Sequence, residues 1–141
     1  EGELAEGELA EGETEGELTE GEGETEAAAP AGDYATLLEE ANGLRGRRKE
    51  AKLREAIAAN PVGGEALTEL AWLLLNRGQY AEARDFSQRA STIDPTSSKA
   101  WITLGAARQS LRDQEGAMQA YRNCVETGTG QYVAECRRVL R

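Results

Sequence analysis

The chain has 141 residues, with 26 acidic and 16 basic side chains, no histidine and a formal net charge of −10 at pH 7. The lack of histidine removes the imidazole base and the histidine metal ligand, and no GxxxxGK[ST] or GxGxxG phosphate-binding loop occurs, so we expect neither catalysis nor a metal or other cofactor. No run of eighteen apolar residues is present, so we expect no membrane span in this segment and a cytoplasmic location.

The first thirty residues differ in composition from the rest of the chain. Residues 1–30 contain twelve glutamates, no lysine, arginine or aromatic residue, and a glycine every few positions. Each glycine lowers helix stability by roughly 1 kcal/mol and neighbouring glutamates repel, so this segment is predicted to be a disordered acidic tail or linker. Residues 31–141 hold 14 acidic and all 16 basic side chains, and we expect them to form one domain.

Two features of composition concern the origin of the chain. Its only methionine is Met118, so it lacks an initiator residue and we expect it to be part of a longer polypeptide. Arginine outnumbers lysine thirteen to three, which favours a GC-rich bacterial source.

The segment 31–63 is predicted to form two amphipathic helices. Apolar side chains at helical spacing mark one face from Tyr34 to Leu44 and another from Leu53 to Ile57. Six basic residues crowd ten positions between and within these faces: Arg45, Arg47, Arg48, Lys49, Lys52 and Arg54. A solvated outer helix face is the usual interpretation of such a run, and the alternative is an anion-binding patch whose nearest anion is the acidic tail.

From residue 56 onward the sequence repeats with a period of thirty-four. Pro61 recurs as Pro95, and Ala56 recurs as Ala90 and then as Cys124. Within each period apolar residues recur at helical spacing, and glycine or proline follows the apolar run. The predicted helices are 65–77, 81–93, 99–111 and 114–127.

The final segment, 131–141, is predicted to form a capping helix whose apolar side covers the preceding unit. Cys136 lies in this helix, twelve positions after Cys124, and without histidine the two cysteines cannot complete a tetrahedral zinc site. Two small, partly buried thiols are the favoured interpretation, since cysteine is among the most buried residue types. A disulfide between the last two helices is the main alternative.

The motifs in the two clearest units have a recognisable spacing. Residues 98–130 contain Trp101-x-x-Leu104-Gly105 followed by Ala117-x-x-x-Tyr121, and residues 64–97 contain Gly78, Tyr80, Ala83, Ala90 and Pro95. These segments resemble tetratricopeptide (TPR) repeats, although Leu67 stands where that family usually has tryptophan.

The resemblance implies an all-α, TPR-type helical-hairpin solenoid. It would consist of repeats at about 31–63, 64–97 and 98–130, the first of them divergent, and a cap helix at 131–141. The resemblance also implies a non-enzymatic scaffold or adaptor that binds a partner peptide or helix in a concave groove. Bacterial secretion, pilus and motility assemblies are the context expected from the family.

The groove is expected on the first helix of each pair. Trp72 and Leu75 are surplus to the packing between helices, and an aromatic side chain beside leucine and asparagine is typical of a peptide anchor site. The alternative is that Trp72 packs beneath a neighbouring helix. The predicted groove residues are Tyr34, Leu38, Asn42, Glu65, Thr68, Trp72, Leu75, Asn76, Lys99, Ile102 and Gln109.

Some TPR domains hold the C-terminal carboxylate of a chaperone with a clamp of lysine, asparagine and arginine side chains. By resemblance only Lys99 fits that clamp here, because the other clamp positions hold Tyr34, Leu38, Glu69 and Thr103, so we expect no chaperone-tail binding. An alternative function is that the acidic tail is an autoinhibitory or partner-shielding polyanion. We do not expect nucleic acid as a ligand, because the twelve glutamates of the tail compete with phosphate.

Overall fold

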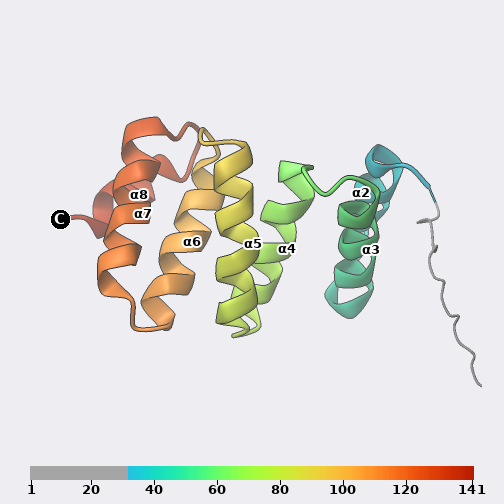
Figure 1. Cartoon of the computed structure of the whole chain (residues 1–141), viewed down its shortest axis with the longest axis horizontal. Coiled ribbons are helices and arrows are strands. Elements are labelled where there is room, and N and C mark those ends of the chain that lie inside the picture. Colours follow the sequence, from blue (N-terminus) through green and yellow to red (C-terminus); the bar gives the residue numbers. More distant parts are fainter. Residues whose placement is uncertain (1–31) are drawn as a thin grey trace, which may run out of the picture. The chain divides into compact units, whose positions relative to one another are not determined.

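A computed structural model describes residues 32–141, and the predicted disordered tail lies outside them (Figure 1). The described residues form seven α-helices: α2 (Tyr34–Asn42), α3 (Gly46–Ala59), α4 (Gly64–Asn76), α5 (Tyr80–Ile93), α6 (Ser98–Ser110), α7 (Gln114–Thr127) and α8 (Val133–Val139). The four helices predicted from the period of thirty-four are present, with ends within one residue of the expected positions. The repeat and domain boundaries given above stay predictions.

The helices pack as successive hairpins. Helix α2 packs on α3, α4 on α5 and α6 on α7, while α3 contacts α4, α5 contacts α6, and α8 covers α7 at the C-terminal end (Figure 1). Helix α4 also contacts α6 directly, so the first helices of consecutive hairpins lie side by side. This arrangement confirms the predicted all-α helical-hairpin solenoid with a C-terminal cap.

Small residues at the repeated positions lie where the helices approach one another. Ala56, Ala90 and Cys124 are all fully or almost fully buried, as are Ala83 and Ala117. Leucines at the remaining inward positions fill the core. Burial of each leucine side chain stabilises the fold by about 2 kcal/mol, and little side-chain rotamer entropy is lost. The largest buried side chains of the core are Leu37, Leu53, Leu67, Leu70, Leu74 and Leu104.

The turns within the last two hairpins use a left-handed residue at equivalent places. Gly78 has a φ of +81° in the α4–α5 turn, and Arg112, thirty-four positions later, has a φ of +71° in the α6–α7 turn. Glycine adopts this conformation without steric cost, whereas a residue with a Cβ is strained there. The turn geometry therefore repeats even where the glycine does not.

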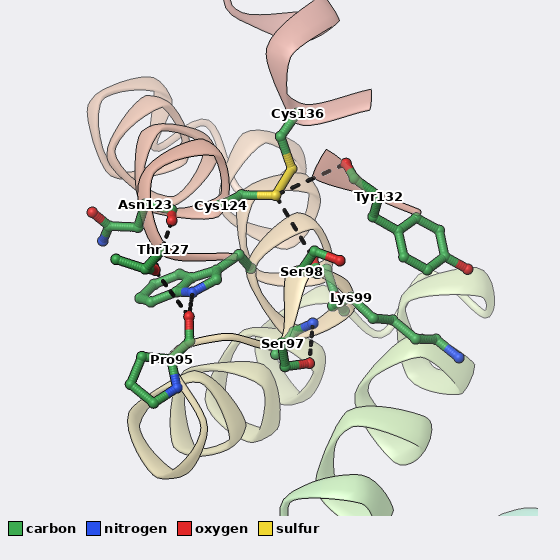
Figure 2. The surroundings of a disulfide bond; sticks show 12 residues. Pro95, Ser97, Ser98, Lys99, Asn123, Cys124, Thr127, Tyr132 and Cys136 are labelled. Atoms are coloured by element: carbon green, nitrogen blue, oxygen red, sulfur yellow. Dashed lines mark hydrogen bonds between the residues drawn. A yellow bond between two sulfur atoms is a disulfide. The ribbon is translucent and has the colours of Figure 1, made fainter. Parts of the chain in front are cut away.

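The two cysteines form a disulfide, so the favoured prediction of two buried thiols is wrong and the alternative is correct. Cys124 of α7 and Cys136 of α8 are covalently joined, with a Cα–Cα distance of 6.2 Å, and neither is exposed (Figure 2). The separation of twelve residues between the two cysteines is enough for the last turn of one helix, a short connection and the first turn of a helix that packs back against it. That geometry brings two buried cysteines within bonding distance, which burial statistics for single cysteines do not anticipate.

Candidate partner-binding face

Several predicted groove residues are part of the packing instead. Leu38 is 9% exposed and lies in the core shared by α2, α3 and α4. Thr68 is 6% exposed, and its hydroxyl donates to the carbonyl of Gly64 within α4. Leu75 packs against the core shared with α2 and α3, and Ile102 packs against the buried cluster around the disulfide. Leu38 and Thr68 therefore offer little surface to a partner, whereas Leu75 and Ile102 are partly exposed and also contribute to the packing.

Tyr34 has a structural contact that its sequence position did not reveal. Its hydroxyl accepts a hydrogen bond of 3.1 Å from the backbone N–H of Ala66, in the first turn of α4. The residue that precedes α4, Gly63, has no side chain to cap these amides, and the Tyr34 ring lies directly over it. In the next hairpin Ser97 caps Ala100 at the equivalent positions, thirty-four residues later. Tyr34 thus supplies across the hairpins the cap that Ser97 supplies locally.

Trp72 lies at the centre of a group of side chains from three parts of the chain. Its ring is 5.6 Å from the ring of Tyr132, centroid to centroid, with the planes tilted by 48°. The ammonium of Lys99 lies 5.3 Å from the Trp72 ring centroid, within the range of a cation–π interaction. The premise that Trp72 has no packing partner is therefore wrong, although the indole remains partly exposed.

Glu69 completes this group. Its carboxylate lies 2.5 Å from the Nζ of Lys99 and 3.8 Å from the Nζ of Lys49 on α3, and all three side chains are between one fifth and one third exposed. We refer to Glu69, Trp72, Lys99 and Tyr132 as the Trp72 cluster. Tyr132 was absent from the predicted groove because no periodicity relates a cap residue to a side chain sixty positions earlier.

A hollow of about 370 Å³ adjoins the Trp72 cluster. It lies between the first turns of α4, the end of α5 and the start of α6, and Glu69 and Lys99 are shared with the cluster. Its lining residues are Gly64, Glu65, Thr68, Glu69, Ile93, Asp94, Ser97 and Lys99. Three carboxylates and one ammonium make this part of the face acidic.

The remaining predicted groove residues are polar and exposed. Asn42 ends α2, Asn76 ends α4 and Gln109 lies near the end of α6. The side-chain oxygen of Gln109 accepts a hydrogen bond of 3.1 Å from the hydroxyl of Tyr121, so part of its capacity is used inside the fold.

The basic cluster predicted around α3 is extensively paired with carboxylates. Lys52 contacts Glu40 and Glu55, which raise the pKa of the lysine in that order of importance. Arg54 contacts Glu50 at 2.8 Å and Glu82 of α5 at 3.3 Å. Hydrogen bonds first from Arg54 and then from Arg77 lower the pKa of Glu50.

These ion pairs join α3 to its neighbours, whereas Arg45, Arg47 and Arg48 are exposed at the start of α3. Lys49, Lys52 and Arg54, half of the basic cluster, thus contribute to contacts between helices. The anion-binding alternative stays a prediction, and the acidic tail that it invokes lies outside the described residues.

A second hollow, of about 470 Å³, shares only Ile93 with the first. It is lined by Pro61, Val62, Gln88, Arg89, Thr92 and Ile93. Val62 is 66% exposed and Ile93 is 40% exposed, which makes this the main rival surface for a hydrophobic partner. None of the helices in residues 32–141 is sufficiently long and apolar to cross a membrane.

Comparison with known proteins identifies the repeats. Family models described as tetratricopeptide repeat match residues 52–85 and 98–127. The heat-shock protein cognate co-chaperone sgt12 of Aspergillus fumigatus is 31% identical over 104 residues, which cover 71% of this chain and 30% of that protein. The chain therefore spans less than a third of this curated relative.

Solved structures share the fold. The Sgt2 TPR domain from Aspergillus fumigatus matches with a TM-score of 0.63 and 26% identity, covering 83% of this chain and 80% of the other. The first TPR domain of Spaghetti (RPAP3), solved with the HSP90 peptide SRMEEVD, matches with a TM-score of 0.66 and 22% identity, covering 77% and 88%. The relatives with a stated organism are eukaryotic, so the comparisons give no support to a bacterial source or a bacterial assembly.

Proposed function

The chain carries tetratricopeptide repeats, and from this premise we propose that residues 32–141 form a non-enzymatic adaptor that binds a segment of a partner polypeptide in the cytoplasm. The proposed binding surface is the Trp72 cluster together with the adjoining 370 Å³ hollow. Support comes from the similarity to TPR domains, one of which was solved with a bound peptide, and from the relative described as a co-chaperone. Function still has to be argued from the site, because one fold serves many functions.

The observation that carries the proposal is the partly exposed Trp72 ring beside polar groups that can orient a peptide. Tryptophan is enriched among residues that dominate binding energy, because its ring buries a large area and loses little conformational entropy. Helices α4 and α6 lie side by side and hold Trp72, Glu69 and Lys99 at fixed separations. A face of this kind can receive an extended segment or a helix that presents an apolar or aromatic anchor.

The charges of the face argue against recognition of a C-terminal carboxylate. Lys99 would be the carboxylate-binding residue, but its ammonium already pairs with Glu69 at 2.5 Å. A second carboxylate brought to Lys99 would be repelled by Glu69 and by Glu65 and Asp94 of the adjoining hollow. The proposed partner segment therefore binds through an internal sequence with hydrophobic anchors.

The test has two arms. In the first, the protein is immobilised, and proteins that it retains from a cell extract are identified by mass spectrometry. The segment of the retained protein that makes the contact is then titrated against wild type and Trp72→Ala. Tyr80→Ala is the matched control, since Tyr80 is 37% exposed on α5 and lies outside the Trp72 cluster. Binding that survives Trp72→Ala unchanged, in a variant with the wild-type helical content, would contradict the proposal.

In the second arm, the peptide SRMEEVD is titrated into wild type and Glu69→Asn. Wild type is expected to bind it far more weakly than the partner segment, and Glu69→Asn is expected to bind it more tightly because the variant leaves Lys99 available. Tight binding by wild type would show that the face accepts a terminal carboxylate after all.

A further inference from the structure

The attachment of α8 depends on very few buried side chains. The helix has seven residues, and Cys136 is the only one of them that is buried. Leu140, just beyond its end, is partly buried against the same cluster. Cys136 is also the residue bonded to Cys124 of α7, so the most buried contact of α8 is the disulfide itself.

The segment before α8 carries Tyr132 to the Trp72 cluster. Thr129 is fixed at the start of this segment, because its N–H donates to the carbonyl of Thr96 at 2.8 Å. After Thr129 the chain passes through Gly130, at a φ of +98°, to Tyr132, and α8 begins at the next residue. In Figure 2 the side chains of Tyr132 and Lys99 both extend to the right of the disulfide. The ring of Tyr132 covers part of Trp72, which is the anchor of the proposed partner site.

We propose that the Cys124–Cys136 disulfide regulates access to the Trp72 cluster. This inference rests on the proposed function and adds a regulator to it. In the oxidised protein the disulfide holds α8 in place, and Tyr132 occupies part of the space that a partner side chain needs against Trp72. In the reduced protein α8 detaches more often, Tyr132 leaves Trp72, and the partner segment binds more tightly.

The redox step is an ordinary thiol–disulfide exchange. An external dithiol supplies two electrons and two protons and becomes a disulfide, the Sγ–Sγ bond breaks, and Cys124 and Cys136 become thiols. The Cys124 sulfur lies 3.8 Å from the carbonyl oxygen of Ser98 on α6, so the reduced thiol has an acceptor for its S–H that does not depend on the position of α8. Reducing compartments favour the thiols and oxidising ones favour the disulfide.

Because both sulfurs are buried, reduction of the disulfide is coupled to the opening of α8. A dithiol reaches the bond only when α8 opens, because neither cysteine is exposed. A partner that displaces Tyr132 should therefore shift the equilibrium towards the thiols, and reduction should raise the affinity for that partner, as linkage between two equilibria requires.

The test uses the unliganded full chain. The indole N–H signals of Trp72 and Trp101 are recorded by NMR with and without dithiothreitol, and thiol titration establishes the redox state. On reduction the Trp72 signal is expected to shift towards its position in oxidised Tyr132→Ala. The Trp101 indole packs against the buried cluster around the disulfide, so its signal reports the reduction itself and not the release of Tyr132. The double variant Cys124→Ser/Cys136→Ser should show the reduced pattern whether or not dithiothreitol is present.

Amide exchange gives a second readout that needs no substitution. The amides of Cys136 and Leu140, bonded to the carbonyls of Tyr132 and Cys136, should exchange on the order of 100-fold faster after reduction, the factor expected from loss of a short disulfide loop. The Thr129 amide should change little. If the Trp72 signal and these amides are unchanged in fully reduced protein, the inference is wrong. Absence of any partner in either redox state would instead overturn the proposed function.

Discussion

At the scale of single residues, Tyr34 supplies the helix cap that the residue before α4 cannot provide. Gly63 and Ser97 occupy equivalent positions before α4 and α6, but only serine has an oxygen that can cap a helix. The hydroxyl of Tyr34 bonds the Ala66 amide in place of the missing cap. Stability at this junction therefore depends on a contact between residues 32 positions apart.

Tyr34→Phe is expected to lower the free energy of unfolding by about 1 kcal/mol, because the Ala66 N–H loses its partner at a half-buried site. Urea denaturation measures the change, with Tyr80→Phe as the control on an exposed tyrosine. Gly63→Ser should not repair the loss, since a Cβ at residue 63 would lie 2.3 Å from the Tyr34 ring. Equal stability of Tyr34→Phe and wild type would show that the cap is unimportant.

A second residue-scale contact joins α6 and α7. A Cβ added to Gly105 would lie 2.5 Å from the ring of the buried Tyr121, so the two helices approach only because this glycine has no side chain. Gly105→Ala should lose about 1 kcal/mol or more of stability despite the better helix propensity of alanine. Gly64→Ala is the matched control, since its Cβ would meet Ile93 at an ordinary 3.5 Å. A melting temperature that rises for Gly105→Ala would contradict this packing.

At the scale of helices, Glu50 of α3 connects three elements. It bonds Arg54 on its own helix and Arg77 at the end of α4, and Arg54 also reaches Glu82 of α5. Helices α3 and α4 belong to consecutive hairpins, so these ion pairs supplement the apolar packing between them.

The lowered pKa of Glu50 gives this network a pH dependence. A carboxyl group whose pKa is depressed by folding contributes stability above its ordinary pKa, and that contribution disappears as the pH falls through the depressed value. Glu50→Gln should therefore be less stable than wild type at pH 7, by roughly 1 kcal/mol at low salt, and the difference should vanish in acid. Denaturation at several pH values tests this, with Glu126→Gln as an exposed control.

The sequence was informative about helices and less so about contacts between distant side chains. The period of thirty-four residues predicted α4 to α7 because each repeat buries the same small and apolar positions. Trp72 was recognised as unusual from its own helix, but its contacts with Tyr132 and Lys99 join residues 27 to 60 positions apart and leave no periodic signal. The ion pairs of α3 likewise depend on how the hairpins meet.

At the scale of the whole chain, the described residues present a mixed, charged surface around Trp72 and an exposed apolar surface around Val62, and Ile93 lines the hollows of both. The first lies on side-by-side helices that hold its side chains in fixed geometry, and the second lies at the junction of a loop with α5. Residues on a rigid framework bind at a smaller entropic cost, which favours the Trp72 face as the partner site.

Chemical-shift mapping of the partner segment on the unaltered protein tests this claim most directly. The largest changes are predicted at the Trp72 indole and the amides of Glu69 and Lys99, and Trp72→Ala should weaken binding by about 30-fold or more, as expected for a central aromatic anchor. Changes concentrated at Val62, Gln88 and Arg89, which line the second hollow and not the first, with affinity unaffected by Trp72→Ala, would contradict the account.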